Sequence, residues 1–322
     1  MAFANPNVSD IIATTIQSRT GKIADNVTQN TALLARLRAR GNVKPFSGGN
    51  VILQELSFAE NPNSGWYSGY DPLPINASDV ISAAQFDIKQ AAVPVTMSGL
   101  EMLQNSGKEQ IIDLMEARIK VAESTMTNLV SAGLYSDGSA AGGKQLPGLL
   151  VAVSKTPTTG QYGGIDRAAF PFWQNRATNP GTAISKDTIQ AEMNTMWASL
   201  TRGSDKPDLI PMDNIFWGFY MASLQPMQRF SDSDMAKLGF TTVKYMSADV
   251  ILDGGIGGDI AASTMYFLNT NYIFFRPHRD RNFVALDPNK RYSVNQDAVV
   301  QILAFAGNLT CSGAQFQGVL FD

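Results

Sequence analysis

Apolar and polar positions alternate in two stretches near the start of the chain. Over residues 53–58 every second side chain falls on one face, and residues 84–89 place apolar side chains on one face only. Such alternation is typical of strands with one buried face. The residues between them are rich in Pro and Gly and include Trp66, Tyr67 and Tyr70, so they cannot continue the strands. We predict a long hairpin whose tip presents three aromatic side chains.

Elsewhere the apolar spacing is helical. The strongest pattern begins at Ser106, which forms a capping box with Glu109, and continues to about Gly133. A helix of about 26 residues is a rod ~40 Å long, more than twice the average length. Shorter helices are predicted over residues 8–16, 31–40, 186–202 and 214–228. Strands are predicted over residues 241–245, 250–252, 265–268, 272–275 and 298–306, and the last should be covered on both faces.

Composition narrows the possible classes of protein. Only 16% of the 322 residues are charged, against about 25% in typical soluble chains, which suggests that much of the surface meets other protein. The single Cys311 excludes an internal disulfide, and the single His278 excludes multi-histidine metal sites. The net charge of -3 argues against a general nucleic-acid binder. With neither a membrane-length apolar run nor a signal peptide, we expect a protein made in the cytoplasm.

Charge is distributed unevenly between the two segments that we expect to project. Residues 1–45 carry six basic residues against two acids, whereas residues 50–88 carry five acids and no Lys or Arg. Clustered positive charge can contact nucleic acid, but no aromatic residues interleave with it here for base stacking. We therefore favour protein contact, with the acidic segment as a complementary surface. The basic end of the first segment consists of Arg36, Arg38, Arg40 and Lys44.

One run resembles a phosphate-binding loop. Residues 138–144 fit its first seven positions, but the eighth is Gln145, where a magnesium-binding loop needs Ser or Thr. The run also follows a predicted helix, whereas the motif connects a strand to a helix. We favour a flexible surface loop, and a nucleotide-dependent enzyme is the alternative from a different class.

The other candidate groups are also better explained structurally. Residues 278–280 resemble the start of a kinase catalytic loop, but no further kinase motif accompanies them, so a turn is favoured. Cys311 lies in a predicted strand, and we interpret it as a small buried residue. Asp253 and Asp259 flank four glycines without the spacing of a calcium loop, which favours a mobile tip. We therefore predict no enzyme, no cofactor and no metal site.

The order of these elements resembles the major capsid proteins of tailed bacteriophages (Caudoviricetes), which have the Hong Kong 97-like fold. The resemblance covers nearly the whole chain, from a basic N-terminal segment through a long hairpin and a very long helix to a final apolar strand. It extends to short stretches that look like those of phage capsid subunits. These are Pro147–Leu149, Gly160–Arg167, Trp173–Asn175, Arg276–Asn282, Asn295–Asp297 and Gly307–Thr310.

The resemblance implies an α+β subunit with a defined division of the chain. Its parts would be an N-terminal arm at 1–45, an extended hairpin loop at 46–90, a peripheral domain with a spine helix at 91–149, an axial domain at 150–265 and strands returning to the peripheral domain at 266–322. The arm residues Arg36 to Lys44 and the three tip aromatics become candidates for subunit contact. Asp253 and Asp259 become candidates for the capsomer axis.

The resemblance also implies a function. Such a subunit assembles into pentamers and hexamers of an icosahedral shell around double-stranded phage DNA, in the host cytoplasm, and remains in the virion. Its partners would be other copies, a portal, a possible scaffolding or decoration protein, and DNA held at the inner face without sequence specificity. No membrane contact is expected. An encapsulin-like bacterial nanocompartment shell is the alternative with the same fold.

Two departures from the family pattern add expectations. Some members join subunits through a Lys–Asn isopeptide bond from the extended loop, but residues 50–88 contain no lysine. We expect no such bond, so denaturing gels should show only monomers. The chain also leaves no room for a long N-terminal scaffolding segment, which implies a separate scaffold or unaided assembly. Charge reversal at Arg36, Arg38 and Arg40 is expected to impair shell formation while leaving the subunit folded.

Overall fold

The computed structural model describes residues 31–71, 76, 80–104, 108–224, 242–253, 259–286, 292–293 and 296–322. Its helices are α2 (Ala32–Ala39), α3 (Gly99–Gln104), α4 (Lys108–Tyr135), α5 (Ala140–Gly143), α6 (Leu149–Ala152), α7 (Ile189–Leu200) and α8 (Asn214–Leu224), with 3-10 turns η1 (Pro171–Trp173), η2 (Thr270–Tyr272) and η3 (Ala314–Phe316). Its strands are β1 (Val51–Ser57), β2 (Ile81–Asp87), β3 (Lys89–Ser98), β4 (Gln161–Tyr162), β5 (Ile165–Asp166), β6 (Arg176–Thr178), β7 (Leu209–Met212), β8 (Thr242–Tyr245), β9 (Ala248–Leu252), β10 (Thr264–Phe267), β11 (Ile273–Leu286), β12 (Tyr292–Ser293), β13 (Gln296–Cys311) and β14 (Gly318–Phe321).

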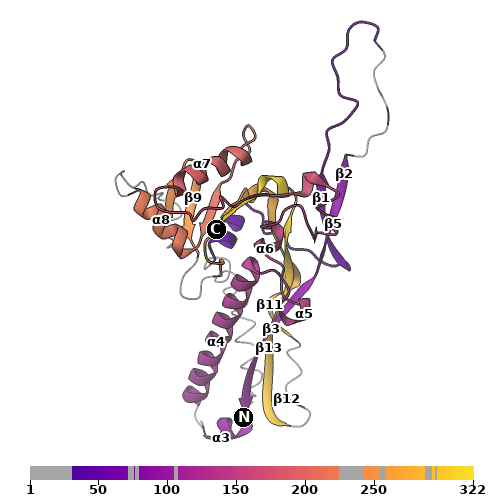
Figure 1. Cartoon of the computed structure of the whole chain (residues 1–322). Helices are drawn as coiled ribbons and strands as arrows, with labels where there is room; N and C mark the ends of the chain where they lie inside the picture. Colours follow the sequence, from indigo (N-terminus) through magenta and orange to yellow (C-terminus); the bar gives the residue numbers. More distant parts are fainter. Residues whose placement is uncertain are drawn as a thin grey trace.

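The elongated part of the molecule is a four-stranded antiparallel sheet covered by one long helix (Figure 1). Strand β13 lies at its centre, pairing with the whole of β3 on one edge and with β11 and β12 on the other. The 28 residues of α4 make a helix ~42 Å long, so the predicted long helix is confirmed, although its predicted cap, Ser106, lies outside the described residues. The α4 face toward the sheet is buried at helical spacing, at Ile119, Ala122, Met126, Val130 and Leu134.

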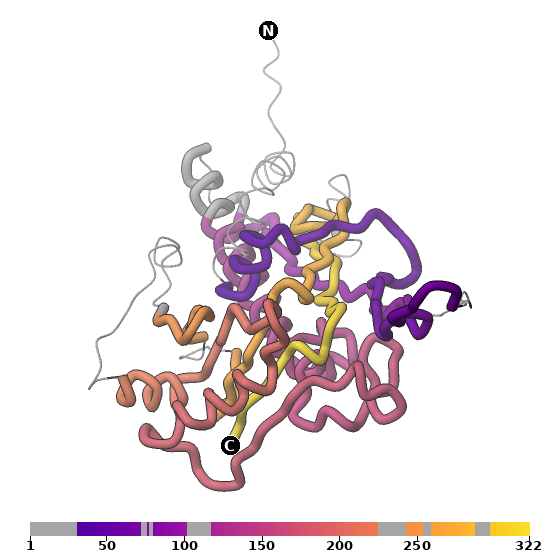
Figure 2. Tube along the Cα trace, turned by 90° about the horizontal axis from the view of Figure 1, so that it is seen from above, coloured from indigo at the N-terminus to yellow at the C-terminus, as the bar shows by residue number. Residues whose placement is uncertain are grey.

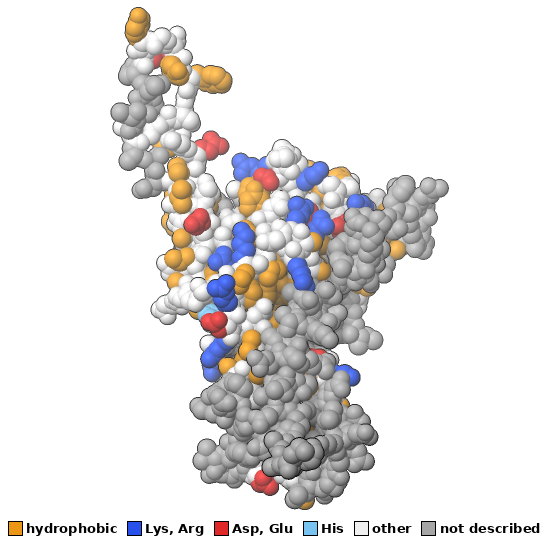
Figure 3. Space-filling model, turned by 180° about the vertical axis from the view of Figure 1, so that it is seen from behind, with side chains coloured by type: hydrophobic (Ala, Val, Ile, Leu, Met, Phe, Trp, Pro, Cys, Tyr) orange, Lys and Arg blue, Asp and Glu red, His pale blue; other side chains and the backbone are white. Residues whose placement is uncertain are grey.

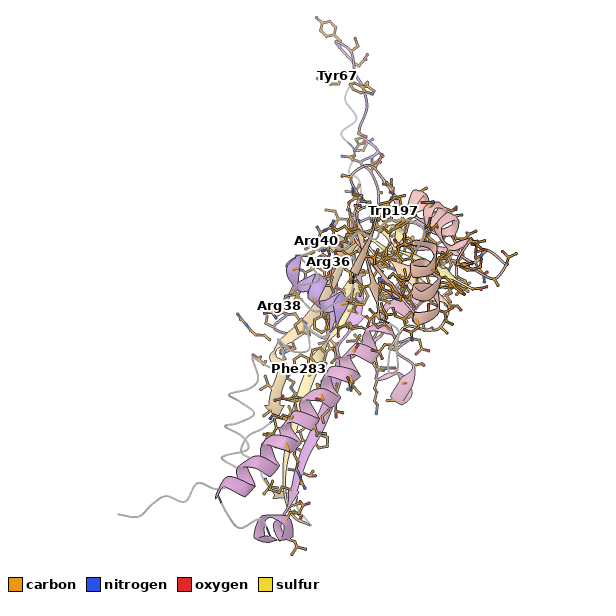
Figure 4. The ribbon with its side chains drawn as sticks, turned by 90° about the vertical axis from the view of Figure 1, so that its left-hand side faces the viewer. Arg36, Arg38, Arg40, Tyr67, Trp197 and Phe283 are labelled. Atoms are coloured by element: carbon orange, nitrogen blue, oxygen red, sulfur yellow. The ribbon has the colours of Figure 1, made fainter. Side chains whose placement is uncertain are left out.

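A β-bulge in β11 turns one large side chain into this core. The register between β11 and β13 shifts between Pro277 and Asn282, and the next residue, Phe283, has a φ of 58°. A bulky residue rarely adopts this left-handed conformation, and a bulge is one of the places where it occurs. Phe283 is 1% exposed and stacks on Phe305 with ring centroids 5.0 Å apart (Figure 4). The bulge therefore lets a long strand bend while keeping its aromatic side chain buried.

The second part is a six-stranded sheet in the order β6-β14-β10-β7-β9-β8, with α7 and α8 beside it (Figure 1). It has its own apolar core, to which α7 contributes Met193, Met196 and Trp197 and α8 contributes Phe216 and Tyr220. The predicted helix at 186–202 is confirmed as a shorter element, and the predicted helix at 214–228 is confirmed over its described residues. The described part of α8 ends at Leu224.

The composition of this second sheet corrects the predicted division of the chain. We expected residues 266–322 to return to the peripheral sheet. Only β11, β12 and β13 do so, whereas β14 pairs with β10 and β6 in the second sheet. Strand β14 has neighbours on both edges, and it contributes Leu320 to the second core and Val319 to the main core.

The predicted N-terminal arm also needs correction over its described residues. Helix α2 packs into the main core, with Leu33, Leu34 and Leu37 each 0% exposed. The chain then runs parallel to β11 through bridges from Val43 to Phe275 and from Phe46 to His278. Figure 2 shows this indigo segment passing beside the orange strand on its way to the hairpin. Residues 31–46 therefore belong to the folded body of the subunit, because their apolar side chains are buried in its main core and their backbone pairs with β11. The predicted helix at 8–16 lies outside the described residues.

Candidate assembly surfaces

The hairpin is held at its base and projects from there. Strands β1 and β2 pair in register from Val51 opposite Asp87 to Ser57 opposite Ile81, as the alternating pattern predicts. Their inward side chains Ile52, Leu56, Ala84 and Phe86 are buried. Phe86 packs edge-on against Tyr162, with ring centroids 5.2 Å apart. The base is thus anchored to the body by ordinary core packing.

The tip of the hairpin presents its aromatic side chains to solvent. Trp66 and Tyr70 are each 106% exposed and Tyr67 is 67% exposed, and Tyr67 lies far from the body in Figure 4. Local turns shape the tip, since the amide of Ser68 donates to Oδ2 of Asp71 at 3.0 Å. The structure confirms that the hairpin projects and that these three rings are not buried by their own subunit.

The three arginines of the predicted arm, Arg36, Arg38 and Arg40, differ in the contacts that the structure shows for them. Arg36 Nε and Arg40 Nη2 each donate to Oδ2 of Asp208 at 3.1 Å, and Arg36 Nη1 lies 3.3 Å from Oδ2 of Asp249. Arg38 is exposed on the outer side of α2 (Figure 4). The expectation that all three reach a neighbouring subunit is therefore wrong for Arg36 and Arg40, because carboxylates of their own subunit already bind them.

Asp208 is the acceptor on which this contact depends. It is 7% exposed, and besides the two arginines it accepts hydrogen bonds from the amide and the hydroxyl of Thr270, at 2.7 and 2.6 Å. Burying a carboxylate is costly unless cations and donors satisfy it, and this one is fully satisfied. The sequence pattern did not reveal Asp208, because nothing in its local sequence indicates that it binds arginines of α2, which lie 168 and 172 positions earlier in the chain.

The two candidate axis residues are docked on the end of the long helix. Tyr135 donates its hydroxyl hydrogen to Oδ2 of Asp253, and Ser131 donates to Oδ2 of Asp259 at 2.6 Å. Burial raises the pKa of Asp253 to about 6, against the opposing effect of the Tyr135 hydrogen bond, and the nearby Asp259 raises it further. The ends of this loop therefore tie the second sheet to α4, and the residues between them lie outside the described part.

The phosphate-loop resemblance finds no matching geometry. The run 138–144 follows α4, not a strand, and it folds as the short turn α5 with Ala141 and Gly142 in left-handed conformation. Gly148 then closes the end of α4, where its amide donates to the carbonyl of Ser136 at 3.0 Å. The loop is a helix-end connection, because the amides that would have to face a phosphate are not at the start of a long helix.

The remaining candidate groups are structural as well. His278 packs edge-on against Phe46, with ring centroids 5.0 Å apart, and its Nδ1 accepts from the amide of Asp280. Cys311 is buried, and burial raises the pKa of its thiol to about 12. Among the described residues, no group of three His, Cys, Asp or Glu could hold a metal ion, and no helix is long and apolar enough to cross a membrane.

Comparison with known proteins finds similarity in structure and not in sequence. No protein family and no curated protein matches the sequence. The capsid subunit of cyanophage A-1(L) matches with a TM-score of 0.68 and 16% identity, over 88% of this chain and 92% of that one. The encapsulin SrpI of Synechococcus elongatus gives a TM-score of 0.55 and 8% identity over 89% and 86% of the chains, and the Mycobacterium phage Bobi structure gives 0.52 and 12% over 88% and 89%.

Each of these matches covers 88–89% of the chain. At such low identity they establish the architecture and not the individual contacts. The predicted α+β class and the resemblance to capsid subunits are confirmed at this level. The chain has the Hong Kong 97-like fold, which is also the architecture of phage capsid and encapsulin shells.

Proposed function

We propose that the chain is a structural major capsid protein that self-assembles into the pentamers and hexamers of an icosahedral phage head. The observation that carries this proposal is the tip of the hairpin, where Trp66 and Tyr70 are fully exposed on a fold shared with capsid subunits. Large exposed aromatic side chains mark contacts with another surface. In a shell, a copy of the same chain supplies that surface.

Energetics favour assembly over an isolated subunit. Fully burying one large apolar side chain contributes about 1.5–3 kcal/mol. Further apolar side chains stay exposed on the outer face of the hairpin, with Leu53 at 56% and Ile81 at 73%. Each contact between subunits is modest, and a shell multiplies them, because every subunit is held by several neighbours at once.

The proposed roles of the parts follow the fold. Residues 89–149 with 273–311 form the peripheral domain, and residues 150–267 with 314–322 form the axial domain. Asp253 and Asp259 are proposed to position the loop between them near the capsomer axis, with α4 as its support. Portal, scaffold or decoration partners, virion localisation and DNA at the inner face belong to the same proposal, as does the absence of catalysis.

A nanocompartment shell is the second candidate, because the encapsulin match supports the same architecture. The two are separated by expressing the chain alone and with its neighbouring genes, then isolating particles by sedimentation. A capsid yields shells that need a portal and packaging proteins to acquire DNA. A nanocompartment yields shells that retain a specific enzyme. Soluble monomer at every protein concentration contradicts both, and a nucleotide titration then tests the loop at 138–144.

A further inference from the structure

A pocket lies against the loop that resembles a phosphate-binding loop. It has a volume of about 350 Å³, which is within the range of small-molecule sites, and it is bounded by α4, β3, β13 and residues 140–146. Its lining is mainly apolar and includes Ala91, Leu129, Val130, Ala140, Leu146 and Phe305. Phe305 is buried, so the pocket reaches the edge of the main core. The loop at 138–144 therefore forms one wall of an apolar cavity.

The loop wall is held in place although its backbone is strained. Ala141, which lines the pocket, has a φ of 53°, a left-handed conformation that is unfavourable for a residue with a Cβ atom. Gly142 and Gly143 are also left-handed, and the carbonyl oxygen of Gly143 accepts from Nζ of Lys89 at 2.9 Å. Strained backbone of this kind is concentrated at functional sites, because there the surrounding structure fixes it. The strain thus directs attention to the cavity that this wall closes.

The charged groups that line the pocket are both cations. They are Lys89 and Lys144, and the described lining contains no Asp or Glu. Lys89 is held by the Gly143 carbonyl and lies 3.6 Å from Oδ2 of Asp87. Lys144 is exposed, and among the described residues its ammonium group has no ion pair. Lys144 is therefore free to bind an anionic group at the pocket.

A further cation lies beside the pocket. Arg281 of β11 donates from Nη1 to Oε1 of Gln90, a lining residue, at 3.4 Å. Figure 3 shows the pale-blue side chain of His278, on the same strand, with Lys and Arg side chains near it. The exposed acids of these two stretches are Asp87 and Asp280, against three cations. The surroundings of the pocket thus carry an excess of positive charge.

We propose that this pocket binds a single-chain amphiphilic anion, such as a medium-chain fatty acid. Its aliphatic chain would lie between α4 and β3, where it would remove the apolar lining from water. Its carboxylate would remain at the mouth and accept a charge-assisted hydrogen bond from Lys144. The inference goes beyond the proposed capsid function and does not depend on it, because every residue that lines the pocket belongs to one subunit.

Two other hollows of the subunit suit this ligand less well. A groove further along β3 and α4 is larger, at about 730 Å³, but its one cation, Arg118, is already bound to Glu101 at 2.7 Å. The pocket at the base of the hairpin has a volume of about 240 Å³, and Glu55 lines it. In either place an anion would meet a carboxylate, and like charges repel. Charge therefore favours the pocket beside Lys144.

Titration of the full-length protein with decanoate, below the concentration at which decanoate forms micelles, tests the proposal. Calorimetry measures binding, and thermal unfolding with and without decanoate measures stabilisation. Decanol and decyltrimethylammonium carry the same chain without the negative charge, and they test whether the site selects an anion.

Three variants locate the site. Lys144→Glu reverses the exposed charge, and Lys206→Glu makes the same change at an exposed position outside the pocket, as the matched control. Ala91→Trp and Leu129→Trp fill the pocket from β3 and from α4. Thermal unfolding of each variant without ligand shows whether it is folded, and if neither tryptophan variant folds, the comparison of the two lysine variants decides.

We expect decanoate to bind at one site per chain and to raise the unfolding temperature, because a ligand that binds only the folded state stabilises it. Lys144→Glu should weaken binding about fivefold or more, since a charge-assisted contact becomes a repulsion. Lys206→Glu should change the affinity by less than about twofold. A folded tryptophan variant should lose binding, because its side chain occupies the cavity.

Several results would overturn the proposal. They are a wild-type protein that does not bind decanoate, equal binding of decanol or decyltrimethylammonium, equal effects of the two lysine variants, and unchanged binding in a folded tryptophan variant. Binding to vesicles of anionic phospholipid without binding of free decanoate would assign these cations to a membrane surface, and it would exclude the single-chain ligand.

Discussion

Arg36 and Asp208 join the N-terminal helix to the second sheet. The Nε atom of Arg36 donates to Oδ2 of Asp208 at 3.1 Å, and the same oxygen accepts from Arg40. Because α2 also leads into the segment paired with β11, this contact connects both parts of the body through one short segment. Arg36 and Arg40, which the sequence pattern assigned to a free arm, therefore hold parts of their own subunit together.

We predict that Asp208→Ala destabilises the isolated subunit by about 3 kcal/mol, because it removes the buried acceptor shared by Arg36, Arg40 and Thr270 and leaves Arg36 with Asp249 alone. Urea unfolding of the free subunit measures this change. Ala39→Gln, at an exposed position of the same helix, should alter the free energy of unfolding by less than about 0.5 kcal/mol. Equal effects of the two substitutions would show that the ion pair does not fix α2.

The tip aromatics should matter only after assembly. Trp66→Ala and Tyr70→Ala remove side chains that are fully exposed, so the unfolding temperature of the free subunit should stay within about 1 °C. Particles carrying either change should disrupt at clearly lower temperature than wild-type particles. Phe58→Ala serves as the contrasting control, since its ring packs on Phe172 in the same subunit and its loss should destabilise free subunits as well.

The pKa of Asp253 makes the link between the second sheet and α4 sensitive to pH. Its folded pKa is raised from 3.8 to about 6, so the folded state binds a proton more tightly than the unfolded state does. The stability that this proton contributes is present below about pH 4 and is lost as pH rises through 6. We predict that Asp253→Asn flattens this dependence and stabilises the subunit at pH 7 by about 1–2 kcal/mol.

Unfolding of wild type and Asp253→Asn between pH 4 and 8 provides the measurement. Asp259→Asn is the matched comparison on the other side of the loop. Because the charge of Asp259 contributes to the raised pKa of Asp253, this substitution should reduce the slope between pH 4 and 6 without abolishing it. An identical pH dependence in wild type and Asp253→Asn would contradict the attribution of this pH dependence to Asp253.

The end of α4 depends on a glycine. A Cβ atom at Gly148 would lie 2.1 Å from the carbonyl oxygen of Leu134, which is backbone and cannot move aside. We predict that Gly148→Ala lowers the free energy of unfolding by more than about 3 kcal/mol or prevents folding. Gly65→Ala is the control, since a Cβ there meets nothing within 4 Å. Soluble expression and thermal unfolding of the two variants test this prediction, and similar behaviour would contradict it.

Local patterns in the sequence were sufficient to predict the hairpin strands and the long helix, and to predict that the hairpin tip is exposed. Alternation placed β1 and β2, helical spacing placed α4, and the concentration of Pro and Gly around Trp66 and Tyr70 predicted that the hairpin would project. These features depend on neighbouring residues only, and a single sequence records them well.

Contacts between distant segments could not be predicted in the same way. The basic spacing of Arg36 and Arg40 is equally compatible with an exposed arm and with a docked helix, and Asp208 decides between them only once the chain is folded. Likewise, the short apolar strand β14 belongs to the second sheet because β10 and β6 flank it. The parallel contact of Val43 and Phe46 with β11 is also one that no local pattern records.

Electron cryomicroscopy of the protein after expression on its own and with a candidate scaffold tests the central claim most directly. If the chain is a capsid subunit, we expect closed icosahedral particles. Their reconstruction should contain five-fold and six-fold capsomers, with each hairpin lying on an adjacent subunit. A uniform population of single chains under all conditions, with Trp66 and Tyr70 protected by their own subunit, would contradict it.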